Sequence, residues 1–174
     1  MPATALPAGD YLVNSRAYAG LVKGAVIISI SRSGSTSELV EAARHAMNAG
    51  AAGLLSVCAA EDAPIAALAS LNLEMPWCFD YAVCQTRTVN NFYAAGLFMA
   101  CACGGDEATL AQLFHTPGYF AEFAQTHEAS LAAFARRPWT HAAVLADGYA
   151  AGLAEEGALA FKEICRLPSN HYHL

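Results

Sequence analysis

Apolar runs alternate with amphipathic segments along this chain, a pattern that predicts strands connected by crossover helices. The clearest strand covers residues 25–30, where Ala-Val-Ile-Ile-Ser-Ile is apolar at almost every position, as in a strand buried in a parallel sheet. Apolar residues then recur at helical spacing over residues 36–50, with acidic residues in the first turns. Residues 53–57 form the second expected strand. This part of the chain predicts an α/β fold with a parallel sheet.

The remainder of the chain continues the alternation with longer helices. We expect strands over residues 75–79 and 141–146, the first of them weakened by a proline. Helices are expected over residues 10–22, 62–70, 86–103, 106–114, 119–136 and 150–165.

The composition is that of a chain that buries most of its residues. Of 174 residues, 56% are hydrophobic and 14% charged, and the mean hydropathy of +0.32 excludes a disordered chain. The net charge of -6 argues against a nucleic-acid partner, which requires a basic surface. The longest uncharged stretch, residues 88–105, has too short an apolar part to span a membrane, and the N-terminus lacks a secretory pattern. We therefore expect a cytoplasmic protein with no membrane partner.

Cysteines and histidines at close spacing raise the question of a metal site. Cys101 and Cys103 form a C-x-C pair, and His171 and His173 form an H-x-H pair. Residues two apart do not face each other on a helix, and no further pair supplies the remaining ligands of a closed zinc site. We expect free, buried thiols, no metal and no cofactor.

One segment between a strand and a helix carries candidate chemistry. It follows the strand at residues 25–30 and reads Ser31-Arg32-Ser33-Gly34-Ser35-Thr36. Open α/β sheets bind ligands at this position, and the free N–H groups of a first helical turn favour an anion. Gly34 permits close approach of the backbone, and the hydroxyls add donors. A phosphate ester suits such a loop.

The same loop has a purely structural interpretation. Ser35 or Thr36 could serve as the N-cap of the helix, with Glu38 completing a capping box. One hydroxyl is enough to cap a helix, and this loop has four. The sequence leaves both interpretations open. Three other strand-loop-helix motifs, G-x-G-x-x-G, the P-loop and the G-x-S-x-G elbow, do not match here.

Three blocks of the sequence resemble the SIS (sugar isomerase) domain family. Residues 27–38 resemble its S-x-S-G-x-T phosphosugar signature, and residues 84–88, Cys-Gln-Thr-Arg-Thr, are similar to its second substrate loop in the isomerase half of glucosamine-6-phosphate synthase. Residues 156–164 are similar to the E-G-A-L-K-x-K-E helix that opens a second SIS domain. Arg32 stands where members of the family often carry Gln, and Gln85 replaces a serine of the synthase isomerase.

The resemblance implies a fold and a binding site. The fold would be a three-layer α/β sandwich, flavodoxin-like, with a parallel sheet flanked by helices, followed by the first β-α unit of a second such domain. Ser31, Ser33 and Thr36 would bind the phosphate, with Gln85 and Thr86 near the sugar. The full candidate set for substrate binding is Ser31, Arg32, Ser33, Gly34, Ser35, Thr36, Gln85, Thr86 and Arg87. Arg87 could instead pair with Asp80.

The resemblance also implies that the chain is part of a tandem protein. Residues 1–137 would be a first SIS domain without its N-terminal helix and strand, and residues 138–174 the start of a second. The family's general base and its H-G-P motif would follow Leu174, so we expect this chain alone to lack turnover. Glu156 and Glu163 are the catalytic candidates within the chain, although both also fit a solvated helix face.

Two functions follow from the resemblance. One is an aldose–ketose sugar-phosphate isomerase or fructosamine-phosphate deglycase that transfers a proton between C1 and C2 without metal or nucleotide. The other is a non-catalytic phosphosugar-sensing module of a regulator. The expected partners are a small sugar phosphate and a second copy of the chain in a homodimer.

Overall fold

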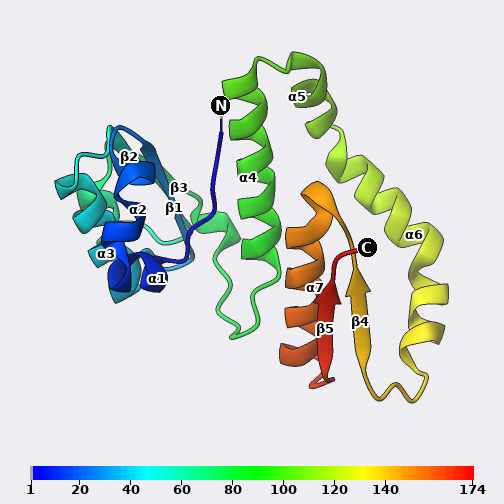
Figure 1. The fold of residues 1–174 in the computed structure, drawn as a ribbon. Helices are drawn as coiled ribbons and strands as arrows, with labels where there is room; N and C mark the ends of the chain where they lie inside the picture. Colours follow the sequence, from blue (N-terminus) through cyan, green and yellow to red (C-terminus); the bar gives the residue numbers. More distant parts are fainter. Residues whose placement is uncertain (1) are drawn as a thin grey trace. The chain divides into compact units, whose positions relative to one another are not determined.

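A parallel three-stranded sheet organises the N-terminal part of the chain (Figure 1). The computed structural model describes residues 2–174, which divide into two units, residues 2–110 and 111–174. In the first unit the strands pair in the order β1 (Val26–Ser31), β2 (Gly53–Cys58) and β3 (Leu71–Glu74). Ile28 lies opposite Leu55, and Leu55 lies opposite Leu71, so the three strands are in register across the sheet. Their carboxyl ends therefore meet at one edge.

Helices cover one face of this sheet. The helical elements of the first unit are α1 (Ala8–Val13), α2 (Ser15–Val22), α3 (Ser37–Asn48), η1 (Ala66–Leu68), η2 (Pro76–Cys78) and α4 (Arg87–Gly104). Ala43 of α3 packs in a buried cluster with Leu54, Cys58 and Ile65, and Ile27 of β1 packs against it. Tyr11 of α1 packs on Ala42 and Ala46 of α3 in a second cluster. The small residues of α3 let it lie close to the strands.

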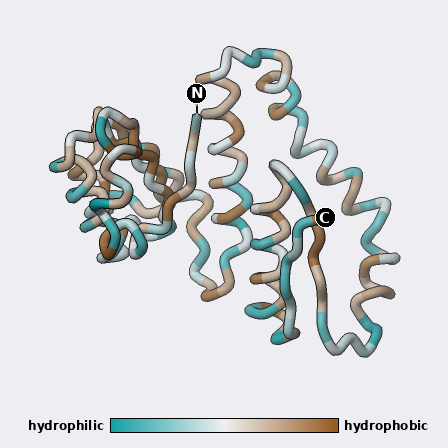
Figure 2. The backbone as a smooth tube through the Cα atoms, viewed as in Figure 1, coloured by the Kyte–Doolittle hydropathy of each residue, from teal (hydrophilic) through white to brown (hydrophobic). Residues whose placement is uncertain are grey.

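The opposite face of the sheet is apolar but largely open. Alternate residues of β1 point there, and Val26, Ile28 and Ile30 are 66%, 51% and 47% exposed. Leu71 and Leu73 of β3 are also exposed. Figure 2 shows β1 and β2 as markedly hydrophobic stretches of the chain. The sequence predicts a buried strand over residues 25–30. The strand β1 is apolar on both faces, but helices cover only one of them.

The second unit is built on a β-α-β arrangement. Its elements are α6 (Thr116–Ala135), β4 (Ala142–Leu145), η3 (Gly148–Ala150), α7 (Ala151–Glu163) and β5 (Ser169–Tyr172), and α5 (Glu107–Leu113) spans the boundary with the first unit. Strands β4 and β5 are parallel. Ala154 and Ala158 of α7 are buried, and Val144 lies 3.6 Å from the position that a Cβ would occupy at Gly157. No helix among the described residues is long and apolar enough to cross a membrane.

Three sequence predictions in the first unit are corrected. The helix expected over residues 10–22 is two helices, because the chain leaves helical geometry at Asn14, whose side chain donates to Asp10 Oδ1 at 2.7 Å. The helix expected over residues 62–70 is only the short turn η1.

The strand expected over residues 75–79 is wrong. The third strand is β3 instead, and its ladder ends where the Met75 N–H donates to Cys58 O at 2.8 Å. Pro76 follows, has no N–H to continue the ladder, and begins the turn η2. In the second unit, the sequence did not predict the strand β5. Together β4, α7 and β5 form a complete β-α-β arrangement, whereas the sequence predicted a single β-α unit. The assignment of residues 138–174 to a second SIS domain stays a prediction.

Candidate functional site

The Ser31–Thr36 loop lies where β1 ends and α3 begins, as the sequence predicted. Gly34 is buried and has φ +57°, a left-handed conformation that favours glycine. A Cβ at this position would lie 2.5 Å from Ala63 Cβ and 2.9 Å from Ile65 Cγ2. The Ile65 N–H donates to Gly34 O at 3.1 Å. The loop is therefore held against the segment that follows β2, and only glycine fits at its centre.

The serine hydroxyls of the loop hold its backbone and remain available as donors. Ser31 Oγ accepts the Gly34 N–H at 3.1 Å, and Ser33 Oγ accepts the exposed Ser35 N–H at 3.3 Å. Because each oxygen accepts a hydrogen bond here, its own proton is free to point at another acceptor. This arrangement fits a loop that presents hydroxyl protons to an anion.

The capping box does not form. Thr36 occupies the N-cap position of α3, but its side chain makes no capping hydrogen bond. Glu38 accepts its own backbone N–H and, at 3.0 Å, the Ser37 hydroxyl, and these bonds lower the pKa of its carboxyl. The loop hydroxyls are thus not used to cap the helix.

The second loop of the site, residues 79–86 between η2 and α4, is held by a single carboxylate. Asp80, whose side chain is 13% exposed, accepts the N–H of Thr88 at 2.9 Å and that of Thr86 at 3.0 Å through Oδ2. The Thr88 N–H, aided by that of Thr86, holds the pKa of the Asp80 carboxyl below its ordinary value despite partial burial. Thr88 Oγ1 in turn accepts the Asp80 N–H at 3.1 Å and donates to Cys78 O at 2.6 Å. These bonds fix the start of α4, the helix that follows Gln85.

Two arginines approach this second loop in different ways. Arg32 Nη1 donates to Asp80 O at 3.0 Å and to Ala82 O at 2.9 Å, so it connects the two loops. Arg87 Nη2 donates to Phe79 O at 2.7 Å, and its Nε lies 3.8 Å from Asp80 Oδ1. Arg87 therefore lies beside Asp80, one of the two partners considered for it, and a role of Arg87 on the phosphate stays a prediction.

A hollow of about 340 Å³ lies between the two loops. It is lined by Ile30, Ser31, Arg32, Ser33, Thr36, Gln85 and Phe92. The volume lies at the lower end of the roughly 300–1,000 Å³ typical of small-molecule sites. The structure thus brings Gln85 to the Ser31–Thr36 loop, whereas Gly34, Ser35, Thr86 and Arg87 do not line the hollow. Hydroxyls, an amide and one cation surround it, with apolar walls at Ile30 and Phe92.

Phe92 was missed from the sequence, and Asp80 was considered only as a partner of Arg87, not as the carboxylate that accepts the N–H groups of Thr86 and Thr88. Phe92 lies on α4 four residues after Thr88, so the two share a helix face, and that spacing could have placed it beside the second loop. Asp80 precedes α4 by seven residues, too far for a local capping pattern to reveal its role. Ile30 was predicted only as part of a strand.

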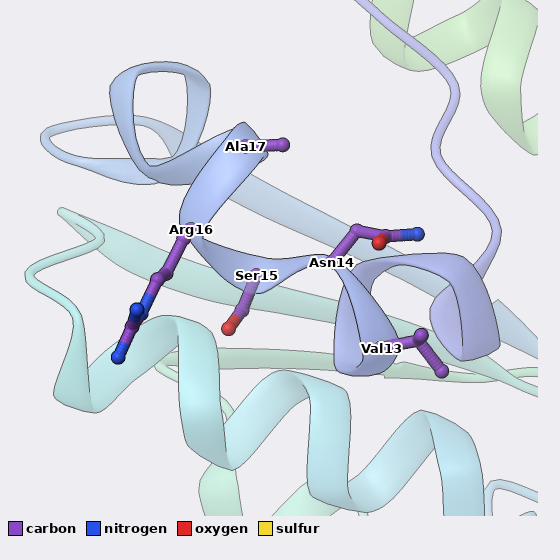
Figure 3. A pocket seen from close by; sticks show the side chains of 5 residues that line it. All are labelled: Val13, Asn14, Ser15, Arg16 and Ala17. Carbon is purple, nitrogen blue, oxygen red and sulfur yellow. The ribbon is translucent and has the colours of Figure 1, made fainter.

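A second hollow of similar size lies at the junction of α1 and α2, lined by Val13, Asn14, Ser15, Arg16 and Ala17. Figure 3 shows that these side chains point in different directions and do not converge on one point. This hollow follows from the break between the two helices and contains none of the predicted site residues.

The catalytic candidates lie on α7 of the second unit. Glu156 is half-buried and Glu163 is exposed. His173 Nδ1 lies 3.6 Å from Asp147 Oδ1, and the rings of His171 and His173 meet edge to face at 6.3 Å. Among the described residues, no group of three His, Cys, Asp or Glu side chains is placed to hold a metal ion.

Comparison with known proteins identifies the fold. No family model and no curated protein matches the sequence. A protein from Silicibacter pomeroyi assigned as a phosphosugar isomerase matches 99% of this chain and 52% of its own, with TM-score 0.79 and 22% identity. Tagatose-6-phosphate ketose/aldose isomerase from Escherichia coli matches 98% of this chain and 48% of its own, with TM-score 0.76 and 19% identity.

A third solved structure is the C-terminal domain of glucosamine-fructose-6-phosphate aminotransferase from Francisella tularensis. It matches 87% of this chain and 46% of its own, with TM-score 0.66 and 18% identity. The chain spans about half the length of the solved structures that it matches. The resemblance to SIS domains is confirmed at the level of structure: the chain has the fold of the phosphosugar isomerases, a parallel sheet flanked by helices.

Proposed function

We propose that this chain binds a sugar phosphate in the hollow between the Ser31–Thr36 loop and Gln85. The observation that carries the proposal is that four residues of the first loop line one hollow of ligand size together with Gln85, which lies far from them in the sequence; the four are Ser31, Arg32, Ser33 and Thr36. Ser31, Ser33 and Thr36 would donate to the phosphate, and the Gln85 amide would contact the sugar. Structural neighbours named as phosphosugar isomerases support this substrate class.

The reaction proposed for the whole protein is aldose–ketose isomerisation or a related deglycation. A base removes the C2 proton of the opened aldose phosphate, the electrons of the C2–H bond form a C1–C2 double bond, and the π electrons of the C1=O1 bond move to O1. The O2 proton moves to O1 and a proton is added at C1, which gives the ketose. The bound phosphate holds the sugar in place while hydrogen bonds stabilise the enediolate oxygen. Glu156 and Glu163 remain the proposed candidates for the base.

A second function, phosphosugar sensing without catalysis, is favoured by one observation. Among the described residues that line the hollow, none is an Asp, Glu, His or Lys, so the lining offers no side chain of the usual bases. Deuterium incorporation at C2 of glucose 6-phosphate, followed by NMR in D₂O, tests whether this chain supplies the base. Exchange catalysed by the chain supports the isomerase over the sensor, whereas binding without exchange fits both the sensor and an isomerase whose base lies outside residues 1–174.

Calorimetric titration with fructose 6-phosphate tests the binding proposal. Ser33→Ala combined with Thr36→Val removes two hydroxyls of the loop, and we expect binding to be lost. Ser130→Ala combined with Thr140→Val is a matched control, because both hydroxyls are exposed and lie in the second unit. Equal affinity in the wild type and the Ser33/Thr36 variant would contradict the proposed site.

We also propose that the protein is cytoplasmic and forms a homodimer. The exposed apolar side chains on one face of the sheet favour burial against another surface. Sedimentation equilibrium would give twice the chain mass of 18.2 kDa for a dimer.

A further inference from the structure

Arg32 belongs to the first loop, but its guanidinium group is bonded to the second. Nη1 donates to the carbonyl oxygens of Asp80 and Ala82, at 3.0 and 2.9 Å. The carbon of the guanidinium group lies 5.5 Å from the centre of the Phe79 ring, within the range of a cation–π contact. Three contacts thus join one side chain to residues that are 47 to 50 positions away in the sequence.

The segment that Arg32 holds leads directly to Gln85. On its far side, the N–H groups of Thr86 and Thr88 bond to the Asp80 carboxylate. The backbone carbonyl of Asp80 therefore bonds to Arg32, and the side-chain carboxylate of Asp80 bonds to the start of α4. Gln85 lies between these two attachments. Gln85 itself lines the hollow.

We propose that Arg32 is a positioning residue that holds Gln85 in the hollow by connecting the two loops. This inference rests on the proposed function, since it assigns how the sugar-contacting side chain is placed. A direct role on the phosphate is the alternative, because Arg32 also lines the hollow. The geometry favours positioning, because Nη1 already donates to two carbonyl oxygens of the second loop. The planar guanidinium group also lies over the Phe79 ring of the same loop.

A double-mutant cycle separates the two roles. Arg32→Met, Gln85→Ala and the double variant are titrated with fructose 6-phosphate and with orthophosphate. For Arg32→Met we expect about a tenfold loss of fructose 6-phosphate affinity, the effect of one lost hydrogen bond, and little loss for orthophosphate. The double variant should lose no more than Gln85→Ala alone. Arg32→Lys, which keeps the charge but not the planar fork, should resemble Arg32→Met.

Additive losses, or equal losses for both ligands, would overturn the positioning role in favour of a direct charge on the phosphate. Arg44→Met is the matched control, because Arg44 is an exposed arginine paired with Glu41 on α3. It should change neither affinity.

Amide hydrogen exchange on the ligand-free chain tests the proposal independently of binding. In Arg32→Met, the amides of Thr86 and Thr88 should exchange faster than in the wild type, whereas Arg44→Met should leave them unchanged. Unchanged exchange in Arg32→Met would overturn the proposal whatever the ligand data show. If the wild type binds neither ligand but exchange rises in Arg32→Met, the proposed function fails while the connection between the loops stands.

Discussion

Asp80 and Thr88 are bonded to each other twice, in opposite directions. The Asp80 carboxylate accepts the Thr88 N–H at 2.9 Å, and Thr88 Oγ1 accepts the Asp80 N–H at 3.1 Å. Thr88 is fully buried. The pair closes the loop between η2 and α4, which contains Gln85, and it supplies an acceptor for N–H groups at the beginning of α4 that have no partner within the helix.

Replacement of Asp80 tests the importance of this closure. The bonds from Thr88 and Thr86 favour the ionised carboxylate, so the folded protein has a lowered Asp80 pKa. Its contribution to stability is full above the ordinary carboxyl pKa of about 3.9 and is lost as the pH falls through the lower folded value. We expect Asp80→Asn to lower the urea midpoint at pH 7. The difference from the wild type should shrink below about pH 4.

The control for this measurement is Glu41→Gln. Glu41 is 57% exposed and, among the described residues, forms an ion pair only with Arg44. Removal of the Glu41 charge should therefore leave the urea midpoint almost unchanged. A gap between Asp80→Asn and the wild type that is constant from pH 3 to 7 would show that the charge of Asp80 does not matter.

Replacement of Gly34 measures how closely the first loop packs. Gly34→Ala places a Cβ in a left-handed conformation and in contact with Ala63 and Ile65. The conformation costs about 1–2 kcal/mol and the overpacking a further ~1–3 kcal/mol of unfolding free energy. Gly24→Ala is the control, because Gly24 has φ +75° and no heavy atom within 4 Å of its Cβ position. It should show the conformational cost alone, and equal losses in the two variants would contradict the close packing.

Phe92 provides an apolar wall of the hollow, next to hydroxyls and an amide. We expect Phe92→Ala to weaken fructose 6-phosphate binding about three- to tenfold, as for roughly 1 kcal/mol of lost apolar contact, while orthophosphate binding stays near the wild-type value. Tyr93→Ala is a matched control, since Tyr93 is the next residue of α4, is 41% exposed and does not line the hollow. A greater loss in Tyr93→Ala than in Phe92→Ala would exclude this wall from the site.

Thiol reactivity should follow burial. Burial raises the pKa of Cys58, with a smaller contribution from Glu74, and burial raises the pKa of Cys78. Cys103 and Cys165 are exposed. With an aromatic disulfide reagent at pH 8, the exposed pair should react first, and Cys58 and Cys78 only as the chain unfolds. Cys103→Ser with Cys165→Ser should remove the fast phase, and its persistence would contradict the described burial.

The errors of sequence interpretation lie where local pattern and sheet pairing disagree. β3 alternates Leu-Asn-Leu-Glu, yet its polar residues point to the covered face, where Ser56 Oγ donates to Asn72 Oδ1 and Asn72 Nδ2 donates to Glu74 Oε1 at 2.8 Å. The two leucines of β3 are exposed. Because every second residue of β3 is polar, its sequence lacks the continuous apolar run that predicts a buried strand. β5 is equally polar, and only its pairing with β4 makes it a strand.

The sequence by itself determined β1, the Ser31–Thr36 loop and α3, because their signals are local: a β-branched run, a glycine among hydroxyls, and helical spacing with acidic residues in the first turns. Only the tertiary structure decided what this loop meets. Arg32 donates a hydrogen bond to the carbonyl of Asp80, 48 residues away, and Phe92 and Gln85 line the same hollow as the loop. Parallel strands bring their carboxyl ends together across long crossovers, so partners at that edge have no fixed spacing in the chain.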